Sequence, residues 1–291
     1  MSYTTGTRFG ISTAPQQVSY HDIVRVWREA DAIPEIEHAW LFDHLMPIGG
    51  DPAGPIFEGW TLLSALAAQT ERLRLGLLVT SNRFRPPAML AKIAATVDIV
   101  SGGRLEFGIG AGSRPSIPWA RREYDAYGLP YHDAAYAAGS LAEACTVIRR
   151  LWTEAEPFDF DGAYLHLTGA FCNPKPVQRP HPPVVIGGRS TATLRVVAEH
   201  ADVWNIPGGD IEDAARRSSL LDSYCAEAGR DPASITRSIF LPVSYDHPGN
   251  TRDAVAEAID AGFRHIVMGL PAPYPENVAE WVTSEVISKS G

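Results

Sequence analysis

The stretch LRLGLLVTSNRFRPPAMLAKIAATVDIVSGGRLEFGIGAG, residues 73–112, contains a complete strand–helix–strand unit. Its first segment, Leu73–Val79, is a nearly continuous apolar run, which is typical of a strand buried on both faces of a parallel sheet. Met89–Val100 is rich in Ala and amphipathic, which indicates a helix, and Leu105–Gly110 follows as a second strand. Two strands joined by a helix are the repeating unit of α/β folds.

The same alternation continues on both sides of this unit. Helical segments, one of them opened by a capping box at Ser19–Asp22, separate six further strand-like runs. These runs are Arg8–Thr13, Ala39–Asp43, Pro183–Gly187, Asp202–Ile206, Ile235–Val243 and His265–Leu270. Eight such repeats in 291 residues predict an α/β fold of the (β/α)8 TIM-barrel type, because helical crossovers make the sheet parallel and eight strands let it close. An open, doubly wound sheet is the alternative.

One connection is longer than the others. About 70 residues separate the fourth predicted strand from the fifth, too many for a structureless loop. Within them Ala134–Trp152 is predicted to be helical, and Phe158–Leu167 alternates like a hairpin that turns at Asp161-Gly162. We therefore expect a single domain over residues 1–291 with an insertion at about 113–182 that covers the barrel mouth.

Composition and charge restrict the partners. The chain is 45% hydrophobic and 20% charged, has no apolar run long enough to span a membrane, and begins without the pattern of a signal peptide, so we expect a cytoplasmic protein. Its net charge of −9 argues against nucleic acid as a partner. Three widely spaced cysteines without a CxxC pair argue against a disulfide framework or a zinc ribbon, and no metal is expected.

The carboxyl ends of the strands, where TIM barrels carry their reactive groups, exclude several chemistries. None of the three lysines lies there, as a Schiff-base aldolase would need. The nine histidines form neither an HxH nor an HExxH motif. Asp43 is the only acid at a strand end, so the paired carboxylates of a glycosidase are missing. A glycine-rich rim with one Asp-His pair suits a flat cofactor better than hydrolysis.

Two rim motifs have both a functional and a structural interpretation. Gly187-Gly188 precedes a helix start at Ser190, where backbone N–H groups could bind a phosphate, or the glycines only turn a tight loop. His44 could donate a proton or a hydrogen bond to an anionic cofactor, with Asp43 orienting it or binding the cofactor itself. Alternatively, Asp43 caps a helix beside a packed histidine.

Aromatic and basic side chains near the rim also have two interpretations. Four aromatic residues of the long connection could line a substrate pocket or attach the insertion to the barrel: Trp119, Tyr124, Tyr127 and Tyr131. Arg83 and Arg85 are predicted to be exposed loop bases that meet an acidic tail or remain solvated.

The sequence resembles the bacterial-luciferase-like flavin and deazaflavin oxidoreductases over nearly its whole length. The resemblance rests on Leu75–Gly112, on AYGLPY at 126–131, and on PKPVQRPHPPVVIGG at 174–188. It implies an insertion-bearing (β/α)8 barrel that forms a homodimer, acts on a small-molecule substrate and binds coenzyme F420 or FMN.

The FDH motif at Phe42–His44 resembles that of the F420-dependent members. This implies that Asp43 lies on the deazaflavin, that His44 faces its reactive edge near C5, and that a non-proline cis peptide joins Leu78 to Val79. The same matching places the cofactor against a set of rim residues, the last two at its phosphate: Leu78, Val79, Thr80, Ser81, Ala111, Gly112, Gly187 and Gly188.

Two departures bear on the substrate. Ile48 and Ser113 stand where the sugar-phosphate dehydrogenases of the family have tryptophan and glutamate, so their proton relay and substrate do not transfer, and Glu123 is a candidate replacement carboxylate. We expect an F420-dependent oxidoreductase that passes hydride between the deazaflavin C5 and a small organic substrate, with His44 steadying charge or protons. The alternatives are an FMN-dependent luciferase-like monooxygenase and a catalytically silent cofactor-binding barrel.

Overall fold

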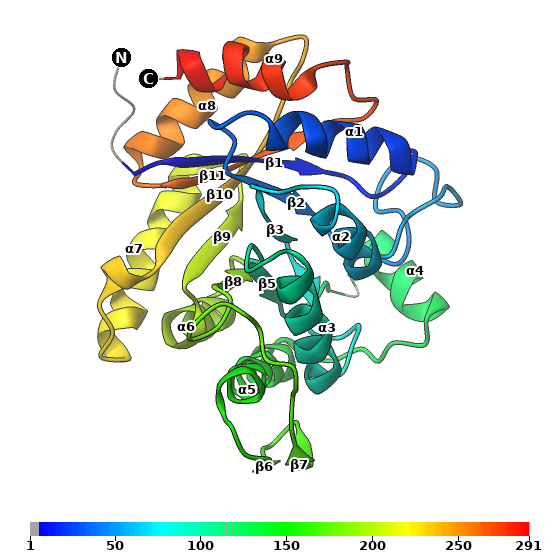
Figure 1. Cartoon of the computed structure of the whole chain (residues 1–291). Coiled ribbons are helices and arrows are strands. Elements are labelled where there is room, and N and C mark those ends of the chain that lie inside the picture. Colours follow the sequence, from blue (N-terminus) through cyan, green and yellow to red (C-terminus); the bar gives the residue numbers. More distant parts are fainter. Residues whose placement is uncertain (1–5, 115, 291) are drawn as a thin grey trace.

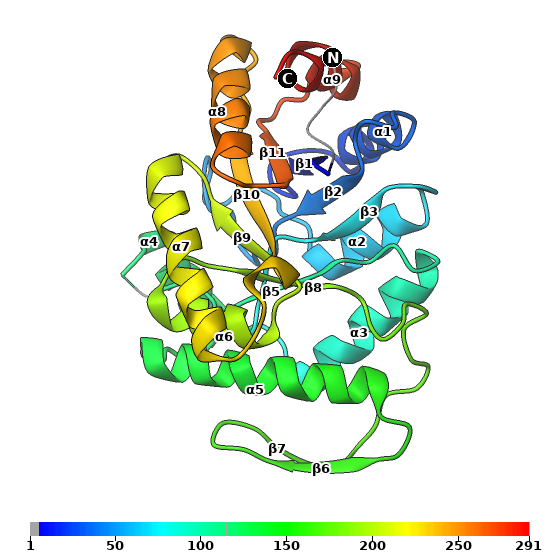
Figure 2. The same cartoon turned by 90° about the vertical axis from the view of Figure 1, so that its left-hand side faces the viewer.

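The computed structural model describes residues 6–114 and 116–290. Within them, parallel strands form a ring enclosed by helices (Figures 1 and 2). The order around the ring is β3-β2-β1-β11-β10-β9-β8-β5-β4. The strands are β1 (Arg8–Thr13), β2 (His38–Leu41), β3 (Arg74–Leu77), β4 (Thr80–Ser81), β5 (Phe107–Gly110), β8 (Val184–Gly187), β9 (Val203–Pro207), β10 (Thr236–Pro242) and β11 (His265–Leu270).

The ring closes at the predicted third strand, which is split into β3 and β4 at Leu78-Val79. The Leu75 N–H donates to the carbonyl of Arg104 at 3.0 Å, and its carbonyl accepts from Glu106 N–H at 2.8 Å. Beyond the split, β4 pairs in parallel with β5. These contacts join the two ends of the strand order, so the TIM barrel is confirmed and the open sheet is wrong.

The outer helices start and stop largely where the sequence predicts. The capping box is present, because Ser19 Oγ accepts from Asp22 N–H and the Asp22 carboxylate accepts from Ser19 N–H. The helices of the ring are α1 (Tyr20–Asp31), α2 (Gly59–Ala67), α3 (Pro87–Val100), α5 (Ala134–Thr153), α6 (Thr191–His200), α7 (Ile211–Glu227), α8 (Pro248–Asp260) and α9 (Val278–Glu285). Each buries an apolar face against the strands, which α1 does with Ile23, Val26, Trp27 and Ala30.

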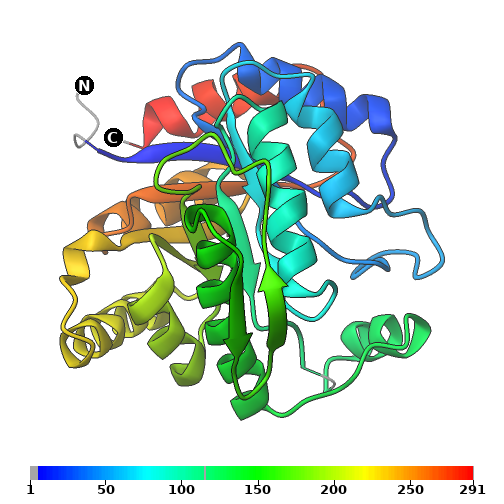
Figure 3. The same ribbon diagram turned by 60° about the horizontal axis from the view of Figure 1, so that its bottom comes forward.

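The long connection contains α5, the predicted hairpin and one helix that the sequence did not predict. Helix α5 lies in the outer ring between α3 and α6 (Figure 2). The hairpin of β6 (Phe158–Asp161) and β7 (His166–Ala170) lies outside α5 (Figure 3). Glu143 of α5 accepts from three backbone N–H groups of the hairpin's turn. The additional helix is α4 (Pro118–Ala126), which lies at the carboxyl rim (Figure 1). An insertion over the mouth from 113 to 182 stays a prediction; α4 is the part of it seen at the rim.

The opposite end of the barrel is filled by a buried charged cluster. Glu106 accepts from Arg8 Nη2 at 2.8 Å and from Arg74 Nε at 2.6 Å, and His265 Nε2 lies 3.4 Å from its other oxygen. The ring of His38 stacks on that of His265 with 3.8 Å between centroids. Burial alone would raise the pKa of Glu106, but its interactions with His265 and Arg8 hold that pKa well below its usual range. The cluster ties four neighbouring strands together away from the mouth.

Acid destabilises this fold partly through His200, at the end of α6. Burial and the positive charges of Arg149 and Arg230 lower the pKa of His200 to about 4. An unfolded histidine titrates near about 6.5. Between about pH 6.5 and 4, His200 is therefore protonated in the unfolded chain but still neutral in the folded protein. The free energy of unfolding falls over this range as the pH is lowered.

We expect urea unfolding to give a lower free energy of unfolding at pH 5 than at pH 7.5. In His200→Gln this difference should be smaller by about 2 kcal/mol. The figure follows because pH 5 lies about 1.5 units below the unfolded histidine pKa and each unit corresponds to about 1.4 kcal/mol. Burial and the charge of His265 also lower the pKa of His38, so part of the acid sensitivity should survive in the variant. An unchanged pH dependence in His200→Gln would show that another group is responsible.

Candidate active site

A histidine and a buried glutamate meet at the carboxyl rim. His44 Nδ1 lies 3.2 and 3.1 Å from the two carboxylate oxygens of Glu123. The same carboxylate accepts from the backbone N–H groups of Leu45 at 2.5 Å and Met46 at 3.3 Å. The Glu123 side chain is 1% exposed and that of His44 is 17% exposed. Because a carboxylate only accepts, Nδ1 carries the proton, and Nε2 is left to face another partner.

Aromatic side chains surround the imidazole on three sides. The ring of Trp119 meets it edge-on with 4.9 Å between centroids, and Phe42 and Phe84 lie at 5.6 and 6.2 Å. These rings limit the rotation of the imidazole, so that Nδ1 stays directed at the Glu123 carboxylate.

Helix α4 therefore supplies both a tryptophan and a carboxylate to His44. Trp119 and Glu123 are candidates from the sequence alone, but the helix that joins them is not predicted by it. Its signal was present: Pro118 is suited to a first helical position, and Ala120, Glu123 and Tyr124 form one buried face at spacings of three and four.

Asp43 points into a second network. Both of its oxygens accept from the guanidinium of Arg85, at 2.6 Å from Nη1 and 3.1 Å from Nη2, and Thr80 also donates to it. The Arg85 guanidinium donates to Glu58 as well, whose carboxylate caps α2. The prediction of a solvated Arg85 is wrong, because two carboxylates bury it to 11% side-chain exposure. The helix-cap interpretation of Asp43 is also wrong.

A platform without side chains lies between β4, β5 and β8. The Leu78–Val79 peptide is cis, as predicted, and Val79 is partly exposed toward the mouth. A Cβ atom at Gly110 or Gly187 would lie 2.8 or 2.9 Å from a methyl group of Val79. Glycine is thus required at both positions, and the bare backbone beside Val79 fits the face of a planar ring.

The predicted phosphate site lies at the end of β8. The Gly188 N–H already donates to the carbonyl of Asn205 at 3.1 Å, and Ser190 caps α6 through the N–H of Thr193. A phosphate here would therefore rely on the first free N–H groups of α6 rather than on Gly188 itself.

The predicted site residues come together in pairs. Thr80 donates a hydrogen bond to Asp43, and the side chain of Val79 packs against the backbone of Gly187. A Cβ at Gly112 would lie 2.7 Å from Ser81 Oγ. Two of the aromatic residues hold α4 in place instead of lining a pocket. The hydroxyl of Tyr127 donates to the carbonyl of Leu45 in the loop after β2, and that of Tyr131 donates to the carbonyl of Arg121 on α4.

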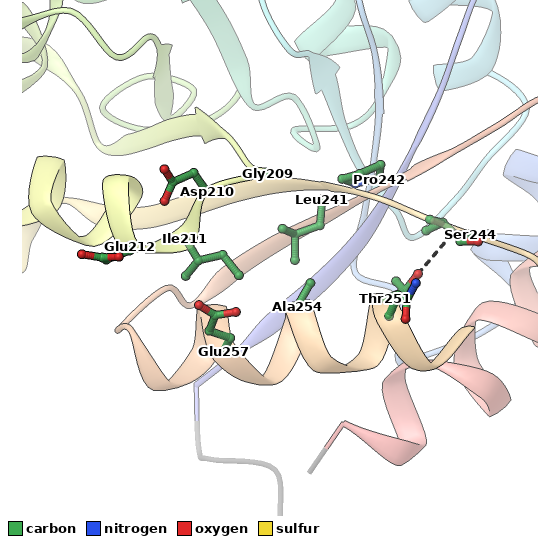
Figure 4. A pocket seen from close by; sticks show the side chains of 12 residues that line it. Gly209, Asp210, Ile211, Glu212, Leu241, Pro242, Ser244, Thr251, Ala254 and Glu257 are labelled. Carbon is green, nitrogen blue, oxygen red and sulfur yellow. Dashed lines mark hydrogen bonds between the residues drawn. The ribbon is translucent and has the colours of Figure 1, made fainter. Parts of the chain in front are cut away.

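A large groove lies away from these residues. It encloses about 640 Å³ between α7 and α8 and contains none of the predicted site residues (Figure 4). The candidate site is therefore identified by the His44–Glu123 pair and the glycines beside Val79, and not by the volume of a cavity. In the part of the chain that the structure describes, no helix is long and apolar enough to cross a membrane.

The barrel and its rim place the protein among the TIM-barrel enzymes. Residues 1–285 match the model of the luciferase-like monooxygenase family, and the chain belongs to that family, so it is an oxidoreductase by class.

Relatives and solved structures agree with this assignment. An uncharacterised protein of Mycobacterium tuberculosis is 30% identical over 243 residues, 81% of this chain and 79% of the relative. A phthiodiolone/phenolphthiodiolone dimycocerosates ketoreductase of Mycobacterium bovis is 31% identical over 209 residues, 70% of this chain and 51% of the relative.

Among solved structures, an F420-dependent secondary alcohol dehydrogenase with an F420–acetone adduct superposes with a TM-score of 0.85 at 18% identity, covering 99% of this chain and all of the other. The F420-dependent tetrahydromethanopterin reductase of Methanopyrus kandleri gives 0.82 at 20% identity, with coverage of 99% and 100%. A monooxygenase of Streptomyces bottropensis gives 0.75 at 21% identity, with coverage of 98% and 100%. These likenesses establish the fold.

Proposed function

We propose that this protein is an F420-dependent oxidoreductase that interconverts a carbonyl compound and its alcohol. The observation that carries the proposal is the His44–Glu123 pair at the rim, beside the glycine platform at Val79. The FDH motif favours a deazaflavin. The activities of two similar proteins, a ketoreductase and a secondary alcohol dehydrogenase, favour a carbonyl–alcohol pair.

We propose that the residues predicted to bind the cofactor contact different parts of it. Leu78 and Val79 would lie under the ring, Ser81, Ala111 and Gly112 beside it, and Gly187 and Gly188 toward its phosphate. Both Asp43 oxygens are occupied, so Asp43 would act by holding Thr80 and the end of β2 rather than by touching the cofactor directly.

Reduced F420, when bound, would supply the hydride that reduction of the carbonyl carbon requires. His44 supplies the proton, from Nε2 to the oxygen that becomes the hydroxyl, and regains it when an alcohol is oxidised. Hydride and proton together account for the two electrons and two hydrogens of the reduction. Glu123 offsets the charge of the imidazolium and keeps Nδ1 protonated, as the carboxylate does in other histidine–acid pairs.

Titration of the purified protein with F420 and with FMN tests the choice of cofactor. We expect micromolar binding of F420 and much weaker binding of FMN, with turnover that persists without dioxygen. Binding of FMN alone, with turnover that requires dioxygen, would establish the alternative favoured by the family model and the Streptomyces neighbour, an FMN-dependent monooxygenase. Cofactor binding with no effect of His44→Ala on any turnover would favour a silent barrel.

We also propose that the protein acts as a cytoplasmic homodimer with a small-molecule substrate. Helix α3 exposes Met89 and Val100, two large apolar side chains that a second copy could cover. Light scattering of the purified protein tests the assembly, and a monomer at micromolar concentration would contradict it.

Substitution at the platform should disturb the cofactor through Val79. In Gly187→Ala the new methyl group would lie 2.9 Å from Val79 Cγ1, so Val79 must move, and we expect F420 affinity to fall about 10-fold, as about 1–3 kcal/mol of overpacking would produce. Fluorescence titration measures the affinity. The double variant Gly187→Ala/Val79→Ala removes the clash and should recover part of the binding; equal loss in both variants would assign the effect to the glycine backbone instead.

A further inference from the structure

Two arginines of one loop have opposite surroundings. Arg85 donates to Asp43 and Glu58, whereas no carboxylate within the described part of the chain lies within 4 Å of Arg83. Backbone contacts hold Arg83 instead. Its Nε donates to the carbonyl of Ala111 at 3.1 Å, and its guanidinium carbon lies 5.9 Å from the ring centroid of Tyr124. The rim therefore carries a positioned cation without a counter-ion.

Two buried donors at this place lack a partner among the residues that the structure describes. Arg83 Nη1 and the Tyr124 hydroxyl are both shielded from solvent and make no hydrogen bond to those residues, and Tyr124 as a whole is fully buried. Gly112, at φ +85°, borders both, because a Cβ there would lie 2.7 Å from the Tyr124 hydroxyl and 3.1 Å from Arg83 Cδ. Leaving such donors unpaired is unfavourable, and an oxyanion would offset this cost by accepting from both.

The unpaired cation adjoins the histidine side of the rim. Phe84, the residue after Arg83, lies 6.2 Å from the His44 ring and 6.1 Å from the Tyr124 ring, centroid to centroid. Tyr124 directly follows Glu123, which holds His44. The proposed cofactor phosphate lies at a different strand end, at the start of α6. An anion on Arg83 would thus belong to the molecule whose reacting group faces His44.

We propose that Arg83 and Tyr124 bind an oxyanion of the substrate, which is then a carbonyl compound or alcohol that also carries a carboxylate. The inference rests on the proposed function for the carbonyl, but the anion site stands on its own contacts. A planar guanidinium matches a carboxylate, and the phenol adds a neutral donor.

Direct binding tests the site without turnover. Calorimetry at constant ionic strength would follow 4-oxopentanoate and its uncharged methyl ester, added to the protein alone and to protein saturated with oxidised F420. We expect saturable binding of the carboxylate in at least one of these states and much weaker binding of the ester. Arg83→Met should weaken carboxylate binding about 10–100-fold, and Tyr124→Phe less, since it removes one neutral hydrogen bond.

A matched variant separates the site from general charge. Arg121 lies on α4 with Tyr124, but its side chain is 72% exposed, so Arg121→Met removes a positive charge outside the proposed site and should leave carboxylate binding unchanged. Equal losses in Arg83→Met and Arg121→Met would overturn the proposal. So would an Arg83→Met variant that loses F420 affinity and keeps its carboxylate affinity, because the anion would then be part of the cofactor.

Turnover with reduced F420 extends the test to a series of oxo acids from 2-oxobutanoate to 6-oxoheptanoate, each beside its methyl ester. Arg83→Met should lower kcat/KM for the acids and not for the esters. An enzyme that binds F420 and reduces only neutral ketones would overturn this inference and leave the proposed function intact. Carboxylate binding through Arg83 in a protein that binds no F420 would support the anion site and overturn the proposed function.

Discussion

Arg85→Met is expected to lower the free energy of unfolding by about 3–5 kcal/mol, the usual effect of leaving one member of a buried ion pair unpaired. The Asp43 side chain is fully buried, and the two Arg85 nitrogens supply two of the three hydrogen bonds that its carboxylate accepts. Methionine preserves the apolar stem but offers neither donor nor charge. Urea unfolding at pH 7 with a constant slope measures the change.

Two further variants separate the charge from the packing. Asp43→Asn/Arg85→Met removes the stranded carboxylate and should be more stable than Arg85→Met alone. Arg216→Met removes an arginine whose side chain is 57% exposed and paired with Glu212, and should change stability by less than about 1 kcal/mol. If Arg85→Met were as mild as Arg216→Met, the Asp43–Arg85 pair would not stabilise the rim.

His44→Ala should lower kcat about 100–10,000-fold, the range of positioned proton donors, and change F420 affinity little. Glu123→Gln tests how the histidine is held. Glutamine keeps an oxygen for the N–H groups of Leu45 and Met46, yet turns an NH2 group toward His44 Nδ1, which moves the imidazole proton to Nε2 and removes the balancing charge. Steady-state kinetics across pH 5–9 should show a large loss of kcat and a changed pH profile.

A KM effect alone would contradict this role for Glu123. Asp125→Asn serves as the control, because it neutralises an exposed carboxylate on the same helix, and kcat is expected to be unchanged. The Glu123→Gln variant should unfold at the same urea concentration as the unsubstituted protein and yet lose turnover. That result would separate the chemical role of Glu123 from its support of the loop at Leu45.

Asp43 and His44 are neighbours in sequence with different surroundings. The Asp43 carboxylate reaches Thr80 and Arg85, whereas the His44 imidazole reaches Glu123 on α4. Both residues lie just beyond the end of β2 and their side chains reach different partners, so one motif serves two networks. Loss of the Asp43 network should therefore appear first in stability and cofactor binding, and loss of the His44 pair first in turnover.

Local patterns predicted the elements well. Buried strands appear as apolar runs and helices as capped amphipathic segments, so the barrel, α5 and the hairpin agree with expectation. The cis peptide at Leu78–Val79 was expected from the family resemblance alone, and it is present. Helix α4 was missed because its nine residues contain arginine, glutamate and aspartate on a mostly polar background, and only three of them are buried.

The sequence by itself determined the strands and the helices of the ring, though not α4, and hence that the rim would carry Asp43, His44 and the glycines, because periodicity and turn chemistry act over a few residues. Only the tertiary structure decided which charges are compensated. Glu123 reaches His44 across 79 positions and Arg85 reaches Asp43 across 42, while Arg83, two residues from Arg85, finds no acid in the described chain. Electrostatic partners depend on distance in space, which barrel closure sets and sequence spacing does not.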